Sequence, residues 1–547
     1  MSSITTALIL LLAVVVSGPL GRVSPVPVPL PLVQIALGAA IAAVADLGVA
    51  LSPEVFFLLF LPPLLFLDGW RIPKEGLFRD KGTILALAFG LVVFTVLGVG
   101  LFVHWMIPAM PLAVAFALAA IISPTDPVAV SAIAARTPIP NRLMHILEGE
   151  SLLNDASGLV CMRFAVLAAL TGTFSLLDAS TTFLWLAIGG VAIGVAVTWS
   201  VTRAKHWASR RFGEEAGSQV LLSLLIPFGA YLLAERLGCS GILAAVAAGI
   251  TMSYVEQTGG ARALTRVRRT AFWDTVQFGA NGVIFVLLGE QLPTIVAGAE
   301  KVVRETGHQD RPWLLIYVVA INAALALLRF VWVWVSLRFT LFTEARHGRR
   351  SDKPSLRLVA ATSVAGVRGA VTLAGVLTLP LALNDGSPFP TRDLAILLAA
   401  GAIVVSLIAA SVGLAPLLKG LELPPEPSHR KEEDRARIMA AEAAIKAIMR
   451  AQHDLAQDRH RDAALCAAAG ARMMQIYRQR IERESKTGEE AEQVREIENV
   501  ERELRLAGIR AERDTLFELA RARMLPEETA RSLVRDLDLL ETRFAAT

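Results

Sequence analysis

Cysteines and enzyme motifs are scarce in this sequence. Its 547 residues include only three cysteines, Cys161, Cys239 and Cys466, which lie far apart and lack the spacing of metal ligands, so we expect them to fill apolar positions. There is no HExxH or GxSxG pattern, no cysteine–histidine ligand set and no GxxxxGK(S/T) loop. These absences argue against an enzyme and against ATP-driven chemistry, and no cofactor is expected.

Charged residues are also few. They make up 19% of the chain, against 54% hydrophobic residues, and the mean hydropathy is +0.54. A composition this apolar predicts an all-α, polytopic integral membrane protein. Apolar windows long enough to cross a bilayer recur as far as Gly420, about 13 in number. The predicted spans are residues 4–20, 28–46, 53–70, 83–107, 111–135, 143–171, 182–202, 218–237, 240–256, 271–298, 312–341, 356–382 and 393–419.

Lysine and arginine are concentrated in alternate loops between these spans. The other loops are nearly bare, except for the one that carries Lys301, Arg304 and Arg311. Because basic loops tend to stay in the cytoplasm, we predict an N-terminus outside and a C-terminus inside the cell membrane. No Lys or Arg precedes the apolar run at 4–20, so we expect a retained first span there and not a signal peptide.

The composition changes after Gly420. The predicted membrane domain, residues 1–420, is followed by a proline-broken linker at 421–429 and by residues 430–547, which are rich in Arg, Glu and Ala with helical periodicity. We expect a cytoplasmic helical domain, with a helix that begins near Pro526. Its charges alternate in sign and form no basic stripe, so nucleic acid is not expected as a partner.

Function is expected where polar residues lie inside the spans, because such residues are costly there and usually face a pathway. The first such cluster is SPTDPVAV, residues 123–130, in which Pro124 and Pro127 flank Thr125 and Asp126. A proline removes a backbone donor and clashes with the preceding turn, so the helix should break there. The freed carbonyls beside a carboxylate are oxygen donors of the kind a small cation needs. The alternative is a kinked packing helix with a buried aspartate.

The second cluster is EGESLLNDASGL, residues 148–159. On a helix, Glu150 and Asn154 share one face, and Ser151 with Asp155 lies one residue further round. Ser151 and Asp155 form a half-site of hard oxygen ligands. In the twelfth span, the sequence GVRG places Arg368 among glycines that allow the helix to unwind. We predict that Arg368 pairs with Glu150, with Asp126 as the rival partner.

The two interrupted spans occupy matching positions if spans one to six and eight to thirteen are inverted repeats. The fifth span then corresponds to the twelfth, and broken helices in matching positions predict a transport site near the middle of the membrane. Other polar residues have simpler explanations: Glu235 lies at a span end, and Arg329 is long enough to reach water or a lipid headgroup. Asn281, beside Gly282, is a candidate for a further helix break.

Five motifs together make the family recognisable. SPTDPVAVSAI, EGESLLNDASG, FFLLFLPPLLFLDGW at 56–70, SGILAAVAAGI at 240–250 and GVRGAVTLA at 366–374 resemble the monovalent cation:proton antiporter family, which includes animal sodium/proton exchangers and prokaryotic NhaP-type antiporters. The resemblance covers roughly residues 5–420. It implies 13 spans, crossed unwound helices, a core domain that moves against a dimerisation domain, and a homodimer in the lipid membrane.

The resemblance also implies roles for individual residues. Asp155 would carry either the cation or the proton, with Asp126, Ser151 and Thr125 as further ligands, so that Na⁺ would bind at Asp155, Asp126 and Ser151. The residues that would organise the site are Asn154, Glu150 and Arg368. Family members with an aspartate at the position of Asn154 tend to be electrogenic, so electroneutral exchange is expected here. Asp68 lies near where some members place another acidic residue, and it is assigned a minor role.

Competition at one carboxylate explains how such a site would work. A partly desolvated carboxylate favours its protonated form, whereas a bound cation favours the charged form. If only the loaded forms cross between the two states, the result is obligate exchange. We therefore expect exchange of Na⁺ or Li⁺ for H⁺. The alternatives are a K⁺/H⁺ antiporter of the same family and a passive cation channel.

Overall fold

The structure is a computed structural model that divides into two compact units, residues 1–421 and residues 422–547. Within the described residues, the regular elements are helices, and an isolated β-bridge joins Ala382 to Pro388. The described residues are 3–23, 28–44, 53–72, 74, 81–126, 130, 141–172, 176–213, 215–257, 263–305, 312–346, 356–383, 385–419, 429–457, 462–486 and 489–545.

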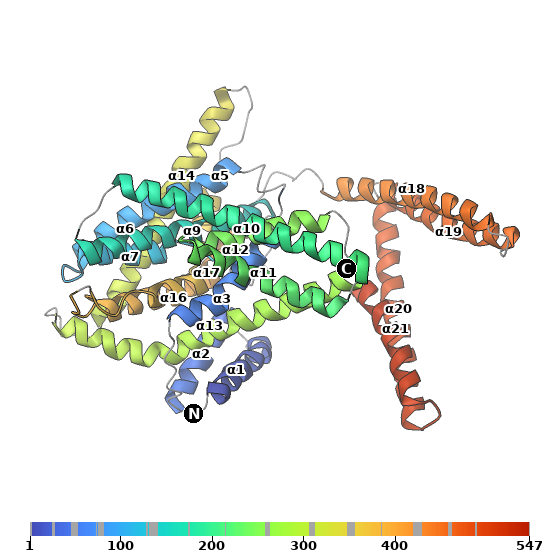
Figure 1. The fold of residues 1–547 in the computed structure, drawn as a ribbon, viewed down its shortest axis with the longest axis horizontal. Helices are drawn as coiled ribbons and strands as arrows, with labels where there is room; N and C mark the ends of the chain where they lie inside the picture. The colour runs from blue at the N-terminus through green and yellow to red at the C-terminus, as the bar shows by residue number, and fades with distance from the viewer. Residues whose placement is uncertain are drawn as a thin grey trace. The chain divides into compact units, whose positions relative to one another are not determined.

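The first unit is an array of apolar helices (Figure 1). Its helices are α1 (Ser3–Val23), α2 (Leu30–Val44), α3 (Pro53–Arg71), α5 (Lys81–Leu85), the π-helix η1 (Ala86–Leu91), α6 (Val92–Met106), α7 (Leu112–Ile122), α9 (Asn141–Thr171), α10 (Leu176–Phe212), α11 (Ala216–Arg236), α12 (Gly241–Gln257), α13 (Ala263–Glu305), α14 (Pro312–Arg346), α15 (Leu356–Val364), α16 (Ala370–Leu377) and α17 (Arg392–Leu418).

The predicted all-helical membrane fold is confirmed. Every predicted span contains a helix, and the described residues include eight helices that are long and apolar enough to cross a membrane. Three shorter apolar helices lie at Leu30–Val44, Leu112–Ile122 and Gly241–Glu256. The number of 13 crossings and the inverted repeats stay predictions.

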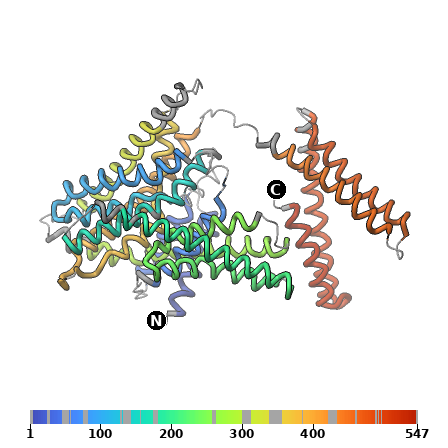
Figure 2. The backbone as a smooth tube through the Cα atoms, turned by 45° about the horizontal axis from the view of Figure 1, so that its top comes forward, coloured from blue at the N-terminus to red at the C-terminus, as the bar shows by residue number. Residues whose placement is uncertain are grey.

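The helices of the first unit pack in two groups (Figures 1 and 2). In the α12 group, α3, α10 and α11 pack against α12, and α1 and α2 pack against α13. In the α9 group, α7 packs against α6 and α9, η1 packs against α9, α15 packs against α14 and α17, and α16 packs against α17. The two groups meet where α13 packs against α16 and α17, where α3 packs against α9 and α16, and where α12 packs against α9.

Glycine permits the closest of these contacts. A side chain on Gly38 of α2 would collide with the carbonyl of Val286 on α13, and one on Gly289 of α13 would collide with the carbonyl of Ile35 on α2. The two helices therefore approach backbone to backbone, as small residues allow in membrane helix pairs. This contact joins α2 to α13, the helix that also packs against α17 of the α9 group.

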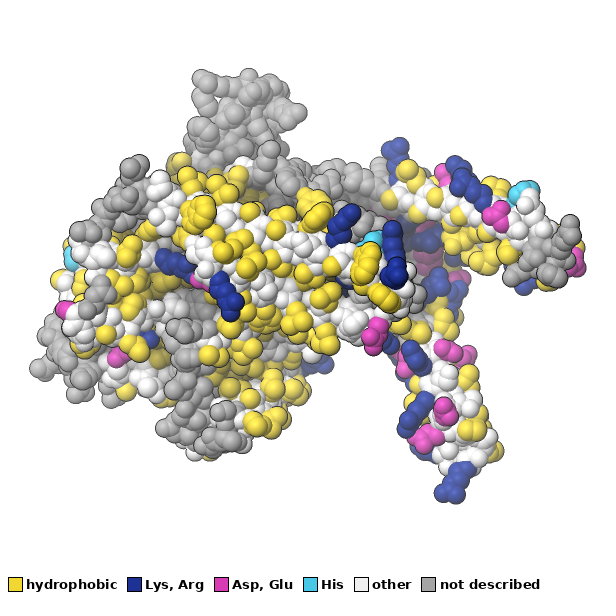
Figure 3. Space-filling model, in the orientation of Figure 1, with side chains coloured by type: hydrophobic (Ala, Val, Ile, Leu, Met, Phe, Trp, Pro, Cys, Tyr) yellow, Lys and Arg dark blue, Asp and Glu magenta, His cyan; other side chains and the backbone are white. Residues whose placement is uncertain are grey.

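Large apolar side chains remain exposed on the outside of the first unit. Trp105 is 77% exposed, Val412 71% and Ile188 66%. Figure 3 shows hydrophobic side chains spread over the face in view, with few charged ones among them. Exposed apolar surface on this scale suits hydrocarbon and not water. The first unit is therefore a multi-pass membrane protein.

The second unit consists of two helical hairpins. One pairs α18 (His429–Ala456) with α19 (Ala463–Glu484), and the other pairs α20 (Glu489–Arg521) with α21 (Glu527–Ala545). The carboxylate of Asp462 accepts the N–H of Ala464 and caps α19, and α21 begins directly after Pro526. Basic and acidic side chains alternate along these helices (Figure 3). The described surface of this unit thus carries charged side chains of both signs, and its placement in the cytoplasm stays a prediction.

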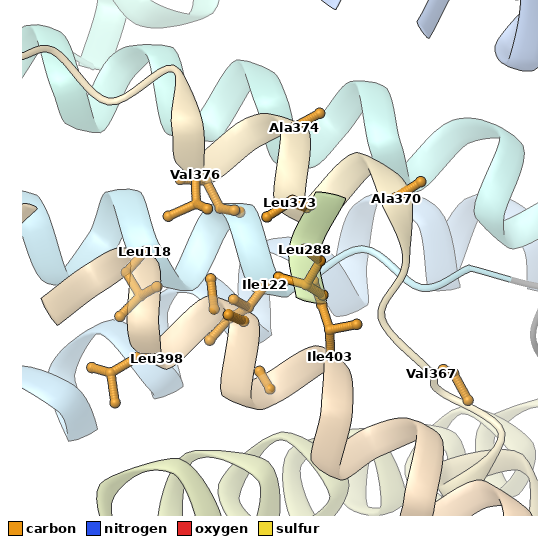
Figure 4. Packing of buried hydrophobic residues seen from close by; sticks show 14 of the residues in the cluster. Leu118, Ile122, Leu288, Val367, Ala370, Leu373, Ala374, Val376, Leu398 and Ile403 are labelled. Carbon is orange, nitrogen blue, oxygen red and sulfur yellow. The ribbon is translucent and has the colours of Figure 1, made fainter. Parts of the chain in front are cut away.

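Two interruptions shape the core of the membrane unit. Helix α7 ends at Ile122, directly before Ser123 and Pro124, and α15 ends at Val364 before an unwound stretch that leads to α16. Figure 4 shows the chain running without helical turns between Val367 and Ala370. The predicted breaks at PTDP and GVRG are thus confirmed as far as residue 126, and Pro127 lies outside the described residues.

Candidate cation-binding site

The two unwound stretches cross and are joined through their main chains. The N–H of Asp126 donates to the carbonyl of Val367 at 2.7 Å, and the N–H of Ala370 donates to the carboxylate of Asp126 at 3.4 Å. Ala370 is the first residue of α16, so the carboxylate lies at a helix N-terminus, where the dipole and free N–H groups stabilise negative charge. A side chain on Gly369 would overlap this carboxylate. The glycine therefore permits the approach.

A small cavity beside the crossing collects the predicted ligands. It has a volume of about 30 Å³, which holds one or two water-sized groups. Asp155 and Ser151 of α9 and Thr125 are each at most 7% exposed. The cavity is lined by Leu61, Leu64, Leu65, Asp68, Pro124, Thr125, Asp126, Ser151, Asp155, Gln277, Asn281, Gly369, Ala370, Val371 and Thr372. All four predicted ligands and Asp68 thus meet at one place.

Three carboxylates share this cavity: Asp68, Asp126 and Asp155. They come from three separate elements, α3, the unwound stretch after α7, and α9. Among the described residues, no group of three His, Cys, Asp or Glu side chains is clustered tightly enough to hold a metal ion by itself. A cation here would need hydroxyl, carbonyl or water oxygens in addition to carboxylates, which is typical of alkali cations in unwound helices.

Glu150 forms a buried ion pair with Arg329 of α14, and the prediction of a Glu150–Arg368 pair is wrong. Arg329 Nη1 and Nη2 reach Glu150 Oε1 and Oε2 at 2.5 and 2.6 Å, and its Nε donates to the carbonyl of Thr362 at 3.0 Å. Glu150 is 1% exposed and Arg329 is 2% exposed. The expectation that Arg329 reaches water or a headgroup is also wrong, because the fork of the guanidinium is fully occupied inside the protein.

Arg368 instead donates hydrogen bonds to main-chain carbonyls at the ends of the broken helices. Its Nε donates to the carbonyl of Ile122, the last residue of α7, at 2.9 Å, and its Nη1 donates to the carbonyl of Gly366. Its own N–H donates to Ser406 Oγ at 3.1 Å. The carbonyls at a helix C-terminus lack intrahelical partners and carry partial negative charge. The positive charge of the Arg368 guanidinium is therefore compensated by main-chain dipoles at the crossing.

A chain of hydrogen bonds links the ion pair to the crossing. Asn154 Nδ2 donates to Thr125 Oγ1 at 3.1 Å, and the Thr125 hydroxyl donates to Glu150 Oε1 at 3.2 Å. Glu150 and Asn154 share the helix face that their spacing predicts. This network fixes Thr125 beside the cavity, while the Asp155 carboxylate accepts no hydrogen bond from the described residues.

A second, larger cavity of about 480 Å³ adjoins the small one, and the two share Asp68, Ser151, Gln277 and Asn281. It extends to Arg71, the last residue of α3, and to Asp274 of α13, and these two residues form an ion pair. It is lined by Leu30, Pro31, Gln34, Asp68, Arg71, Ile72, Glu148, Ser151, Leu152, Asp274, Gln277, Phe278, Asn281, Gly282 and Phe285. Acidic side chains along this cavity favour the approach of a cation.

Asn281 and Gln277 lie four residues apart on α13, which is continuous from Ala263 to Glu305. The prediction of a helix break at Asn281 is therefore wrong. Both side chains line the two cavities, and Gln277 Oε1 accepts a hydrogen bond from Arg71 Nη1 at 2.8 Å. The sequence contained a signal for this pair, since two amides four apart on one helix face are unusual in a membrane span.

Comparison with known proteins shows the family to which this chain belongs. The family model described as "Sodium/hydrogen exchanger, transmembrane" matches residues 7–420. A protein of Escherichia coli K12 named as an uncharacterised Na⁺/H⁺ exchanger, YjcE, is 41% identical over 98% of both chains. The sodium, potassium, lithium and rubidium/H⁺ antiporter of Bacillus subtilis is 37% identical over 98% of this chain and 78% of its own length.

The fold is also found in a solved structure. The sodium/proton antiporter MjNhaP1 of Methanocaldococcus jannaschii superposes with a TM-score of 0.58 over 76% of this chain and 99% of its own, at 20% sequence identity. At this identity the likeness concerns the fold alone. The family match, by contrast, spans the crossing, the cavities and all the predicted ligands. The chain therefore belongs to the transmembrane sodium/hydrogen exchanger family, a family of transporters and not of enzymes.

Proposed function

We propose that this protein exchanges Na⁺ or Li⁺ for H⁺ across the cell membrane by alternating access, with cation and proton competing for Asp155. The observation that carries the proposal is the position of Asp155. Its buried carboxylate faces a cavity of about 30 Å³ beside two crossed, unwound helices, together with Asp126 and Ser151. Such a carboxylate holds a proton or a partly dehydrated cation, and binding of one excludes the other.

Coupled transport follows from the free-energy cost of moving the Asp155 carboxylate when it carries neither a proton nor a cation. A bare carboxylate is expensive to carry through an apolar barrier, so only the protonated or cation-bound forms change state. Asp126 is held at the start of α16, which favours its charged form and makes it a fixed ligand. Asp155 is the residue that binds a proton and a cation in turn. Ser151 and Thr125 complete the site with oxygen ligands, and Asp68 attracts the cation to it.

The organising residues have divided roles. Glu150, held by Arg329, keeps the hydrogen bonds to Thr125 in place, and Asn154 supplies the second of these bonds. Arg368 holds the ends of the interrupted helices. Because position 154 is Asn, and family members with an aspartate there tend to be electrogenic, we propose electroneutral exchange of one cation for one proton. Transport in proteoliposomes should then be independent of a clamped membrane voltage, and voltage dependence would overturn the stoichiometry.

A wider cation range is the second candidate. The Bacillus subtilis relative is named for sodium, potassium, lithium and rubidium, and it is similar to 98% of this chain. Oxygen ligands from unwound helices and a cavity that adjoins a larger one can accept cations of several radii. K⁺/H⁺ exchange at the same site is therefore the alternative. A passive channel would use the same polar spans without coupling the two ions.

The cellular arrangement is part of the proposal. The alternate basic loops support a topology in which the N-terminus lies outside the cell and residues 430–547 lie in the cytoplasm. The exposed apolar surface of the membrane unit supports contact with lipid and with a second copy in a homodimer.

The central test uses everted membrane vesicles with a pH-sensitive dye. Adding Na⁺ or Li⁺ should release quenching in the wild type and not in Asp155→Asn, and an imposed proton gradient should drive cation uptake. Asp385→Asn is a matched control, because Asp385 is exposed and lies between α16 and α17. Dequenching that survives Asp155→Asn would remove Asp155 from the mechanism. Dequenching by K⁺ as well as by Na⁺ and Li⁺ would favour the wider cation range, and dequenching by K⁺ alone would favour K⁺/H⁺ exchange. Cation uptake that does not depend on the proton gradient would favour a channel.

A further inference from the structure

An ion pair connects the two helix groups of the membrane unit. Arg163 Nη2 of α9 lies 3.1 Å from Glu235 Oε1 of α11, and these helices belong to different groups. The pair Arg329–Glu150 instead joins two helices of the α9 group. The pairs Arg71–Asp274 and Arg269–Glu256 join helices of the α12 group. The Arg163–Glu235 bridge therefore spans the boundary along which the groups would move.

The bridge and the larger cavity lie on opposite sides of Asp155. Arg163 follows Asp155 by eight residues on the uninterrupted helix α9, which is about 12 Å along the axis. Glu148, which lines the larger cavity, precedes Asp155 on the same helix. The small cavity at Asp155 thus adjoins the larger cavity on the Glu148 side, while the helix groups are tied together on the Arg163 side.

We propose that the Arg163–Glu235 bridge is a latch that favours the state seen here, in which Asp155 communicates with the larger cavity. The inference rests on the proposed alternating access. Because α9 is one continuous helix, a displacement of Asp155 relative to the α12 group carries Arg163 away from Glu235. The bridge must break when the site changes sides. Arg163 and Glu235 are positioning residues and do not touch the cation.

The strength of the bridge suits a latch that opens in every cycle. The side chain of Arg163 is 45% exposed and that of Glu235 is 33% exposed, so water and salt screen their attraction. An ion pair of this kind changes the ratio of two states by up to about fivefold. It biases the equilibrium without trapping the protein in one state.

Glu235 has a second contact that the experiment must separate from the bridge. Its Oε1 also accepts the N–H of Gly241 at 3.1 Å, at the start of α12. Arg163→Gln removes the bridge and leaves this contact in place, so it is the cleaner variant. Glu235→Gln keeps an acceptor for Gly241 and removes the charge. Glu215→Gln is the matched control, because Glu215 is exposed and precedes the other end of the same helix, α11.

The test measures how fast a cysteine in the larger cavity reacts. The full chain is used with Cys161, Cys239 and Cys466 replaced by alanine and with Phe278→Cys as reporter, since Phe278 lines that cavity and is 44% exposed. A membrane-impermeant maleimide is applied to vesicles of each orientation. Arg163→Gln should lower the labelling rate from the side of the larger cavity, by up to about fivefold. Glu215→Gln should leave the rate unchanged.

The double variant provides the decisive comparison. If the two residues act as one bridge, Arg163→Gln with Glu235→Gln should lower labelling no further than either single change. Unchanged labelling in Arg163→Gln, or additive effects in the double variant, would overturn the latch. Each variant should unfold at the same temperature as the single-cysteine protein without further changes. An equal unfolding midpoint shows that the labelling rate is measured on folded protein.

The labelling assay needs no transported ion, so the two proposals can fail separately. A wild type that exchanges no cation, with labelling that still falls in Arg163→Gln, would keep the latch and remove the proposed function. Normal exchange with labelling that Arg163→Gln does not change would remove the latch alone.

Discussion

The carboxylate of Asp126 occupies the space that a side chain at Gly369 would need. The contact forms where the stretch after α7 crosses the stretch before α16, and the N–H of Ala370 donates to the same carboxylate. A single methyl group at position 369 would therefore push a predicted cation ligand away from the helix end that holds it.

Gly369→Ala should consequently impair both the site and the fold. We expect a loss of about 1–3 kcal/mol in unfolding free energy, because the added carbon has no space, and a raised apparent KM for the cation. The measurements are unfolding in detergent and dequenching in everted vesicles. Gly229→Ala is the control, since nothing lies within 4 Å of a side chain at that position. Equal behaviour of the two variants would show that the close approach of Asp126 is not required.

Breaking the buried pair of Glu150 and Arg329 should be strongly destabilising. Arg329→Met leaves a carboxylate that is 1% exposed without its guanidinium, and such losses cost about 3–5 kcal/mol. The double change Glu150→Gln with Arg329→Met should recover part of that loss. Unfolding in detergent measures both. Glu433→Gln, which breaks an exposed pair with Arg437, should cost less than about 1 kcal/mol. A loss in Arg329→Met no larger than in this control would contradict the prediction.

Asp68→Asn should slow the capture of the cation and spare the exchange step. Asp68 lines both cavities and approaches the small one from α3, a different helix from the one that carries Asp155. Removing its charge weakens the attraction along the pathway, so the apparent KM should rise several-fold with a largely retained maximal rate. Dequenching at varied Na⁺ gives both quantities. A lost maximal rate would instead make Asp68 an obligatory ligand.

Arg392→Gln should loosen helix α16 at the end opposite to Asp126. Arg392 Nε and Nη2 donate to the carbonyls of Leu379 and Leu377, at 3.0 and 3.2 Å, just at the C-terminal end of α16. Charge-assisted hydrogen bonds of this kind contribute about 1.5–3 kcal/mol. We expect a lower unfolding midpoint and a weaker apparent affinity for the cation, whereas Arg236→Gln, at an exposed helix end, should change neither. An unchanged midpoint in Arg392→Gln would contradict this role.

The helix breaks could be predicted from the sequence because their causes are local. Pro124 removes a backbone donor within its own turn, and glycines 366 and 369 permit unwinding without help from distant residues. The shared face of Glu150 and Asn154 follows from helical spacing in the same way. Asp155, Asp126, Ser151 and Thr125 consequently appear in one cavity, as the family motifs imply.

The partner of Glu150 could not be predicted in this way. Two arginines at membrane depth, Arg329 and Arg368, were available, and the choice depends on how α14 and α9 pack. The sequence favours Arg368, which lies among glycines that allow the helix to unwind. Unwinding also exposes main-chain carbonyls such as those of Ile122 and Gly366, and these accept hydrogen bonds from the guanidinium instead. The contact between Arg163 and Glu235 also depends on how the helices pack. The position of Glu235 at the end of a span does not predict this partner.

The bond from the N–H of Asp126 to the carbonyl of Val367 uses only main-chain atoms. No replacement of either side chain, other than proline at position 126, deletes the donor or the acceptor. Substitutions of the side chains around the crossing can therefore change the preferred ion while the two main-chain stretches remain joined. A ligand side chain such as Ser151 can thus be replaced, and the preferred ion changed, without removing the main-chain bond that joins the two stretches.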